Sequence, residues 1–280
     1  MTGTPQITDF DALRRQRQRA SRNPVLFLHE EAAAEVQERL AEINKSFTSP
    51  VLIGHVTPPL ATLFPAAPIL ADTETLDIGR AAHDLVVHAF ALHWADDPIG
   101  QMAQARLALE PDGLFLAIMF GGATLNELRT ALAEAETGLT GGLSPRVLPM
   151  ADLRDLGGLL SRAGLALPVA DSLKLTVRYP TLTRLLHDLR GMGEANALAA
   201  RHRRTPPRDL FARTEEIYRQ HFSDGEGFLR ATFEVVFLTG WAPSDTQPKP
   251  LRPGSAQQRL ADALGTTEHG AGDPAAPKSR

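Results

Sequence analysis

Residues 81–120, AAHDLVVHAFALHWADDPIGQMAQARLALEPDGLFLAIMF, decide the fold that we predict for this chain. The runs at 85–87 and 114–120 are apolar at every position, which is typical of strands that helices cover on both faces. Between them, residues 99–109 have apolar side chains at helical spacing, and Pro-Asp-Gly at 111–113 predicts the turn that ends this helix. Strand, helix and parallel strand form a βαβ unit, whose crossover we expect to be right-handed.

The composition narrows the class of protein. The 280 residues carry a net charge of −4, so we expect no general attraction to nucleic acid. Cysteine does not occur, which excludes disulfides, thiolate catalysis and cysteine-ligated zinc. The sequence has no apolar run of about 18 residues and no signal-peptide core at its start, so we expect a cytoplasmic α/β protein without a transmembrane segment.

The chain divides into three predicted regions. Residues 1–45 form a helical N-terminal region, 46–243 the α/β domain, and 244–280 a disordered tail with a short helix near 256–264. Arginines cover more than one face of the first helix, at positions 14, 15, 17, 19 and 22. They indicate either a solvated helix or a basic arm for an acidic partner or an anionic surface.

The segment SPVLIG at 49–54 predicts a strand that ends in Gly54, as the first strand of a nucleotide-binding α/β domain does. The turn that follows is His-Val-Thr-Pro-Pro at 55–59. It is poorly suited to hold an adenosyl ligand, because Val56 has a side chain where the backbone would approach and prolines have no N–H to donate. Only thirty residues separate Gly54 from Asp84, which leaves room for about one βα unit.

Two acidic residues follow the one strand candidate in that interval, residues 67–71. Asp72 and Glu74 are candidates to contact an adenine or a ribose, and ordinary loop carboxylates are an equally good interpretation. We expect no place in so short a segment for the acid that normally binds ribose at the end of a second strand. Together with Gly54 and His88, these two acids form the predicted cofactor-binding set.

Histidine and tryptophan side chains gather near the carboxyl end of the strand at 84–88, where open α/β sheets bind ligands. His93 is the candidate catalytic base, with a hydrogen-bonded core histidine as the alternative. Trp94 offers a stacking surface, although a role as core anchor is the favoured interpretation. His83, His88 and His93 are five residues apart and share no helical face, so we expect no metal site.

Two segments follow the second buried strand. A helix is predicted over 124–136, opened by Thr124 and Glu127 as a capping box. The glycine-rich segment 137–150 is a candidate mobile lid over a pocket.

Short motifs spread over residues 8–243 occur in a specific order: Leu92-His93-Trp94, Pro111-Asp112-Gly113, Met119-Phe120-Gly121-Gly122, Ser144-Pro145-Arg146, Asp155-Leu156-Gly157, Tyr179-Pro180, Met192-Gly193-Glu194 and Gly240-Trp241. In this set the chain resembles the complex I assembly factor 5 family. That family belongs to the class I S-adenosylmethionine-dependent methyltransferases and is related to the malonyl-carrier-protein methyltransferases of biotin synthesis. The resemblance implies a Rossmann-like α/β fold, a three-layer αβα sandwich on a seven-stranded sheet, here with a shortened N-terminal half and helical insertions.

The chain departs from the family where the cofactor binds. The family's first motif is an acidic residue followed by Gly-x-Gly-x-Gly, and here Leu52, Gly54, Val56 and Pro58 stand at the acid and glycine positions. The resemblance therefore implies the fold with S-adenosylmethionine as the associated cofactor, while the motif itself predicts that cofactor binding is weakened or lost.

We accordingly favour a pseudoenzyme that acts as an assembly or binding factor for a protein partner, with a respiratory complex I subunit as the partner that the resemblance implies. One alternative is an active methyltransferase on a protein or carrier-protein substrate. It would hold S-adenosylmethionine through Gly54, Asp72, Glu74 and His88 and use His93 as base. The other alternative is an arginine hydroxylase, as in the mitochondrial member of the family.

Overall fold

The computed structural model describes residues 6–207, 209–247 and 265. The described residues up to Ser244 belong to one compact unit, and 245–247 and 265 belong to a second. The helix expected near 256–264 and most of the expected tail lie outside the described residues. No helix in the described part of the chain is both long and apolar enough to cross a membrane.

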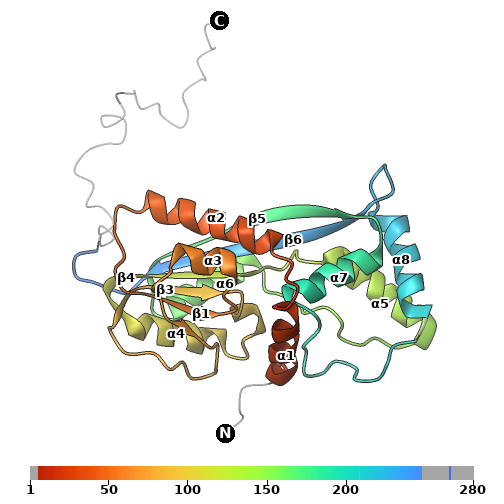
Figure 1. Cartoon of the computed structure of the whole chain (residues 1–280), viewed down its shortest axis with the longest axis horizontal. Coiled ribbons are helices and arrows are strands. Elements are labelled where there is room, and N and C mark those ends of the chain that lie inside the picture. The colour runs from red at the N-terminus through yellow and green to blue at the C-terminus, as the bar shows by residue number, and fades with distance from the viewer. Residues whose placement is uncertain (1–5, 208, 248–264, 266–280) are drawn as a thin grey trace, which may run out of the picture. The chain divides into compact units, whose positions relative to one another are not determined.

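The core of the first unit is a mixed six-stranded sheet with the order β2-β1-β3-β4-β6-β5 (Figure 1). Its strands are β1 (Pro50–Gly54), β2 (Ile69–Leu70), β3 (His83–Ala89), β4 (Leu109–Phe120), β5 (Ala166–Tyr179) and β6 (Leu229–Trp241). Strands β1 to β4 are parallel to one another, whereas β6 is antiparallel to β4 and β5 is antiparallel to β6. The apolar runs at 85–87 and 114–120 lie in the adjacent central strands β3 and β4, as predicted.

Helices cover both faces of the sheet. They are α1 (Phe10–Ala20), α2 (Phe27–Glu42), α3 (Pro58–Leu63), α4 (Pro98–Ala108), α5 (Asn126–Thr140), α6 (Leu153–Arg162), α7 (Leu182–Met192) and α8 (Asp209–Phe222), with the 3₁₀ helix η1 (Leu92–Trp94) after β3. One face packs against α2, α3, α5, α7 and α8, and the other against α4 and α6. Figure 1 shows α2 and α4 on opposite sides of the strands. The predicted three-layer αβα sandwich is therefore confirmed.

The family resemblance implies a seven-stranded sheet, and this prediction is wrong. The described residues form a sheet of six strands. Between Gly54 and His83 the chain forms α3 and β2, a strand of two residues. Strand β2 pairs directly with β1, with Ile69 opposite Leu52. An acid, Asp72, consequently follows the strand beside β1, whereas its role in binding a ribose stays a prediction.

The turn predicted at 111–113 does not separate helix from strand. Helix α4 ends at Ala108, and the Pro-Asp-Gly segment lies inside β4, where the pairing with β3 is irregular. Asp112 has φ +62° and its N–H donates to the carbonyl of Ala242 at 3.1 Å. This bond to Ala242, the residue after β6, holds the segment in β4, although its own residue types predict a turn.

The capping box predicted for α5 is also wrong. The Thr124 hydroxyl donates to the carbonyl of Glu234 at 3.2 Å, and the Glu127 carboxylate accepts the Thr232 N–H at 3.1 Å. Leu125 stands at the N-cap with φ +54°, and no side-chain cap bond is found for it among the described residues. Bonds to β6 replace the local cap.

Candidate functional site

A cavity of about 880 Å³ lies at the carboxyl ends of the parallel strands, the edge at which open α/β sheets bind ligands. Residues of α1, the ends of β1 and β2 and the segment before α4 line it. Three predicted cofactor residues, Gly54, Asp72 and Glu74, are brought together here. The fourth, His88, is not among the lining residues.

Gly54 occupies a position that only glycine tolerates. Its φ is +97°, and a Cβ atom there would lie 2.6 Å from the carbonyl oxygen of Ala89 and 2.7 Å from Cβ of Ala91. The close approach of β1 to the end of β3 is therefore sufficient to explain this glycine, whether or not a ligand binds beside it.

The turn after Gly54 uses its N–H groups internally. The His55 N–H donates to Ala89 O at 2.8 Å and the Val56 N–H to Gly54 O at 3.1 Å. The next helix, α3, starts with Pro58 and Pro59, which have no N–H. The turn is consequently a poor cradle for an anionic or adenosyl group.

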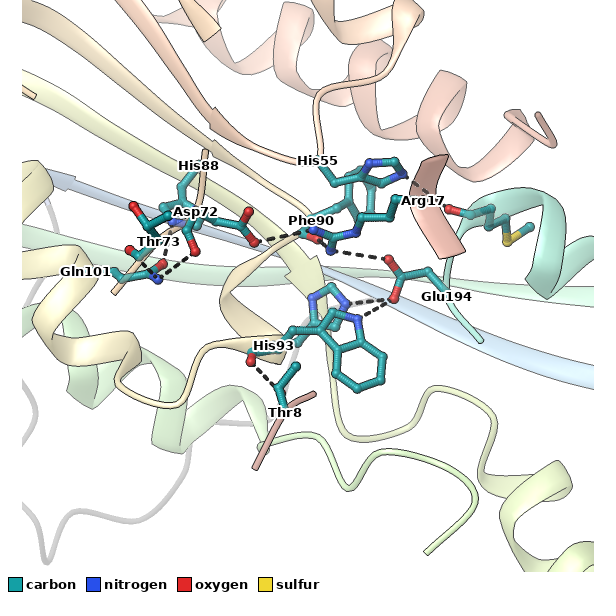
Figure 2. A network of polar contacts seen from close by, with 12 residues as sticks. Thr8, Arg17, His55, Asp72, Thr73, His88, Phe90, His93, Gln101 and Glu194 are labelled. Atoms are coloured by element: carbon teal, nitrogen blue, oxygen red, sulfur yellow. Dashed lines mark hydrogen bonds and ion pairs between the residues drawn. The ribbon is translucent and has the colours of Figure 1, made fainter. Parts of the chain in front are cut away.

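Asp72 is engaged by an arginine of α1. The Arg17 Nη1 atom lies 3.3 Å from Oδ2 of Asp72, and Nη2 donates to the carbonyl of Phe90 at 2.7 Å. The same Nη2 lies 3.6 Å from Oε1 of Glu194 (Figure 2). The Asp72 carboxylate is thus partly neutralised, whereas Glu74 is exposed at the same cavity. Arg17 itself does not fit the solvated interpretation of the first helix, because its side chain is 12% exposed.

His88 lies behind the cavity wall, on β3. Its Nε2 is 2.9 Å from Oε1 of Gln101, and the Gln101 amide donates in turn to the carbonyls of Asp72 and Thr73 (Figure 2). Burial, as the largest cause, lowers the pKa of His88 to about 4, so the ring is neutral at pH 7. Any effect of His88 on a ligand would therefore pass through Gln101, and its predicted role in cofactor binding stays a prediction.

His93 and Trp94 share one acceptor, the carboxylate of Glu194. Trp94 Nε1 donates to Oε2 at 2.6 Å, and His93 Nε2 lies 3.1 Å from the same oxygen. The His93 side chain is fully buried and its ring packs against Phe120, with centroids 5.2 Å apart. A catalytic role for His93 stays a prediction, since the ring does not line the 880 Å³ cavity. It also does not line a second, apolar cavity, which is described below and has Trp94 in its wall.

Glu194 is a buried anion. Burial by itself raises the pKa of the carboxyl, but the neighbouring His93 and Arg17 outweigh that cause and lower the pKa to about 2. The side chain is 6% exposed and ionised at pH 7. Among the described residues, no group of three or more His, Asp or Glu side chains is placed to hold a metal ion.

A second cavity, of about 210 Å³, is lined in part by Glu194, which does not line the larger cavity. Its wall is mainly leucine, methionine and phenylalanine side chains. Trp94, Glu194 and two arginines, Arg146 and Arg190, are also among its lining residues. The segment predicted as a lid contributes residues 146–148 and Met150. Its Arg146 is held by Glu136 through two hydrogen bonds of 3.1 and 2.6 Å. The segment thus covers an apolar pocket, whereas its mobility stays a prediction.

Sequence reasoning missed two residues of this site. Arg17 is one of four arginines in α1, and nothing local distinguishes it from the others. Glu194 follows His93 by 101 residues, and its signal was its place in the Met-Gly-Glu motif that carries the family resemblance.

This chain is similar in sequence to several known proteins. No family model matches the chain. The Danio rerio protein named arginine-hydroxylase NDUFAF5, mitochondrial, is 32% identical over 262 residues, which cover 84% of this chain and 81% of the relative. The malonyl-[acyl-carrier protein] O-methyltransferase of Laribacter hongkongensis is 34% identical over 197 residues, covering 70% and 64%. Among solved structures, the YcgJ protein from Bacillus subtilis is 13% identical with a TM-score of 0.47, covering 76% of this chain and 99% of that one.

Proposed function

The chain belongs to the family of the arginine hydroxylase NDUFAF5, within the class I methyltransferase superfamily, and we propose that it is a binding factor for a cationic side chain of a partner protein. The observation that carries the proposal is the buried carboxylate of Glu194 at the apolar cavity. Buried ionised groups are costly unless they are paired and hydrogen-bonded. Trp94 and His93 hold Oε2 of Glu194, whereas Oε1 has only Arg17 at 3.6 Å and no hydrogen-bond donor among the described residues.

The 880 Å³ cavity, which contains the predicted cofactor residues, has room for S-adenosylmethionine but offers few groups to hold it. A volume of about 880 Å³ is within the range of small-molecule sites. Gly54, Asp72 and Glu74 are the residues that would contact the cofactor. Against this fit, the turn amides are used internally, two prolines start α3, and Asp72 faces Arg17.

The expected loss of affinity follows from those missing contacts. Each charge-assisted hydrogen bond to a ligand contributes roughly 1.5–3 kcal/mol. Losing the ribose acid to Arg17 and the amide cradle to internal bonds would weaken cofactor binding by about three powers of ten. We therefore propose that cofactor binding is weakened or lost.

The 210 Å³ cavity suits a cationic side chain with an apolar stem. Leucine, methionine and phenylalanine side chains of the 210 Å³ cavity match the methylene stem of an arginine or lysine, and Glu194 matches its charged end. Trp94 adds an aromatic wall that favours a guanidinium. Since several relatives are named as arginine hydroxylases, arginine is the side chain that we propose. The partner protein that we propose is a respiratory complex I subunit, as the family resemblance implies.

The size of the larger cavity favours a second candidate, an active S-adenosylmethionine-dependent methyltransferase. In that case Gly54, Asp72 and Glu74 would hold the cofactor, whose chemistry is methyl donation. His93 would act through Glu194, because its ring contacts that carboxylate and lines neither cavity. Arginine hydroxylation, the activity in the relatives' names, is a third candidate and would use the same pocket for the same side chain.

Calorimetry with S-adenosylmethionine tests whether the 880 Å³ cavity binds the cofactor. We expect no measurable binding up to about 1 mM, because the missing contacts move an ordinary micromolar constant into that range. A micromolar Kd would contradict weakened binding and favour the methyltransferase.

Fluorescence tests whether the 210 Å³ cavity binds a cationic side chain. The chain has two tryptophans, so Trp241→Phe leaves Trp94 as reporter inside the pocket. We expect N-acetyl-L-arginine methylamide to change its emission and the neutral isostere, N-acetyl-L-citrulline methylamide, to leave it unchanged. Glu194→Gln should abolish the response, whereas Glu234→Gln, at a buried acid that lines neither cavity, should preserve it. An equal response to citrulline, or an unaffected Glu194→Gln variant, would refute the proposal.

A further inference from the structure

Helix α1 borders the larger cavity and directs one side chain, Arg17, into a set of three acceptors (Figure 2). These are the Asp72 carboxylate after β2, the Phe90 carbonyl after β3 and the Glu194 carboxylate after α7. They come from three parts of the chain that are far apart in sequence and converge on a single guanidinium. Two carboxylates and a carbonyl form an acceptor set suited to the planar array of N–H donors of such a group.

Arg17 satisfies this acceptor set incompletely. At 3.6 Å, its Nη2 is too far from Oε1 of Glu194 for a hydrogen bond, and Oε1 has no other donor among the described residues. The Nε–H of Arg17 is buried and also lacks an acceptor in the described part of the chain. By contrast, Arg146 binds Glu136 through two short hydrogen bonds. Because unsatisfied buried donors and acceptors are costly, a better-placed cation would gain free energy at Glu194.

Helix α1 is held at both ends, and its second half is anchored by the buried Ala20 and by the Gln16 amide, which donates to the Asn196 carbonyl at 3.1 Å. Three of its eleven side chains are buried. The Thr8 hydroxyl donates to the Trp94 carbonyl at 2.6 Å, and the Asp9 N–H donates to the Ala197 carbonyl at 2.8 Å. Arg17 lines the 880 Å³ cavity, so its side chain has room to leave the acceptor set by a change of rotamer while the helix stays in place.

We propose that the acceptor set is a guanidinium site that the chain fills with its own Arg17, and that an incoming cationic side chain must displace Arg17 to bind Glu194. The identity of the incoming ligand rests on the proposed function, whereas the site itself rests on the Arg17 contacts. Arg17 is then a built-in competitor, and the apparent affinity for a ligand falls by the fraction of molecules in which Arg17 has withdrawn.

Chemical rescue tests the site without reference to the partner. Arg17→Met keeps an unbranched stem and removes the guanidinium. Arg14→Met is the matched control, because Arg14 is on the same helix, is 75% exposed and pairs with Asp11 at the surface. We expect methylguanidinium to raise the melting temperature of Arg17→Met, and to do so more than methylammonium, without a comparable rise in Arg14→Met or the parent. Equal shifts in all three proteins would overturn the proposal.

If Arg17→Met does not fold alone, the same titration is followed by circular dichroism. Refolding by methylguanidinium, with no refolding by methylammonium, supports a guanidinium site, and a chain that stays unfolded in both overturns it.

Competition tests the displacement. In the Trp241→Phe background we expect Arg17→Met to bind N-acetyl-L-arginine methylamide about tenfold more tightly than the parent, while Arg14→Met binds as the parent does. Equal affinities in parent and Arg17→Met would overturn displacement and leave the proposed function standing. Rescue by methylguanidinium without any binding of the arginine ligand would support the site and contradict the proposed function.

Discussion

The buried histidine of α2, His29, makes the stability of this protein depend on pH in a way that one substitution can isolate. His29 is 1% exposed, and neither ring nitrogen has a hydrogen-bond partner among the described residues. Its ring packs against Phe90 and His55, with centroid distances of 4.6 and 5.6 Å. Burial, followed by the charge of His55, lowers the pKa of His29 to about 3.

The magnitude follows from proton linkage. The unfolded chain binds a proton at this histidine below its ordinary pKa of about 6.5, whereas the folded chain does not until about pH 3. Because the folded pKa is depressed, the contribution of His29 to stability is complete above pH 6.5 and is lost as the pH falls. At pH 5, about 1.5 units below the unfolded value, the loss is about 2 kcal/mol at about 1.36 kcal/mol per unit. This figure holds for any folded pKa well below 5.

The variant His29→Phe removes the titrating group and keeps an aromatic ring against Phe90. We expect the parent to lose about 2 kcal/mol more unfolding free energy than His29→Phe between pH 7.5 and pH 5, measured by urea denaturation at each pH. His202→Phe replaces an exposed ring and should follow the parent.

Comparing the two pH values within each protein cancels any constant packing difference that the new ring introduces. Parallel pH dependence of the parent and His29→Phe, within about 0.5 kcal/mol, would refute the assignment of His29 as a buried neutral histidine.

Three further predictions concern packing and pairing. Gly54→Ala should cost about 3 kcal/mol of unfolding free energy, since its Cβ would lie 2.6 Å from Ala89 O at φ +97°; a urea-denaturation loss below about 1 kcal/mol would contradict that close approach. Arg146→Met should cost about 2 kcal/mol at pH 7.5, because Glu136 loses both guanidinium bonds, and an unchanged urea midpoint would disprove the pairing. Leu160→Ala, at a fully buried position, should cost about 3 kcal/mol and lower the melting temperature by roughly 6–12 °C in calorimetry; a shift under about 2 °C would contradict its place in the core.

The central strands were predictable because the local pattern of apolar residues indicates them. Strands buried on both faces are apolar at every position, so β3 and β4 could be located within a few residues. The same reasoning failed where distant partners compete with local signals. Pro111 and Gly113 predict a turn, yet the bond from Asp112 to Ala242 holds the segment in β4. Glu127 predicts a cap, yet Thr232 of the neighbouring strand captures its carboxylate.

The sequence by itself determined the buried strands, the shortage of N–H donors after Gly54 and room for a single strand before residue 84. These properties depend on residues close together in the chain, and their chemistry is local. Only the tertiary structure decided that Arg17 points inward and that Glu194 meets His93 and Trp94. Pairing across about 100 or more residues depends on how helices pack on the sheet, which local spacing does not encode.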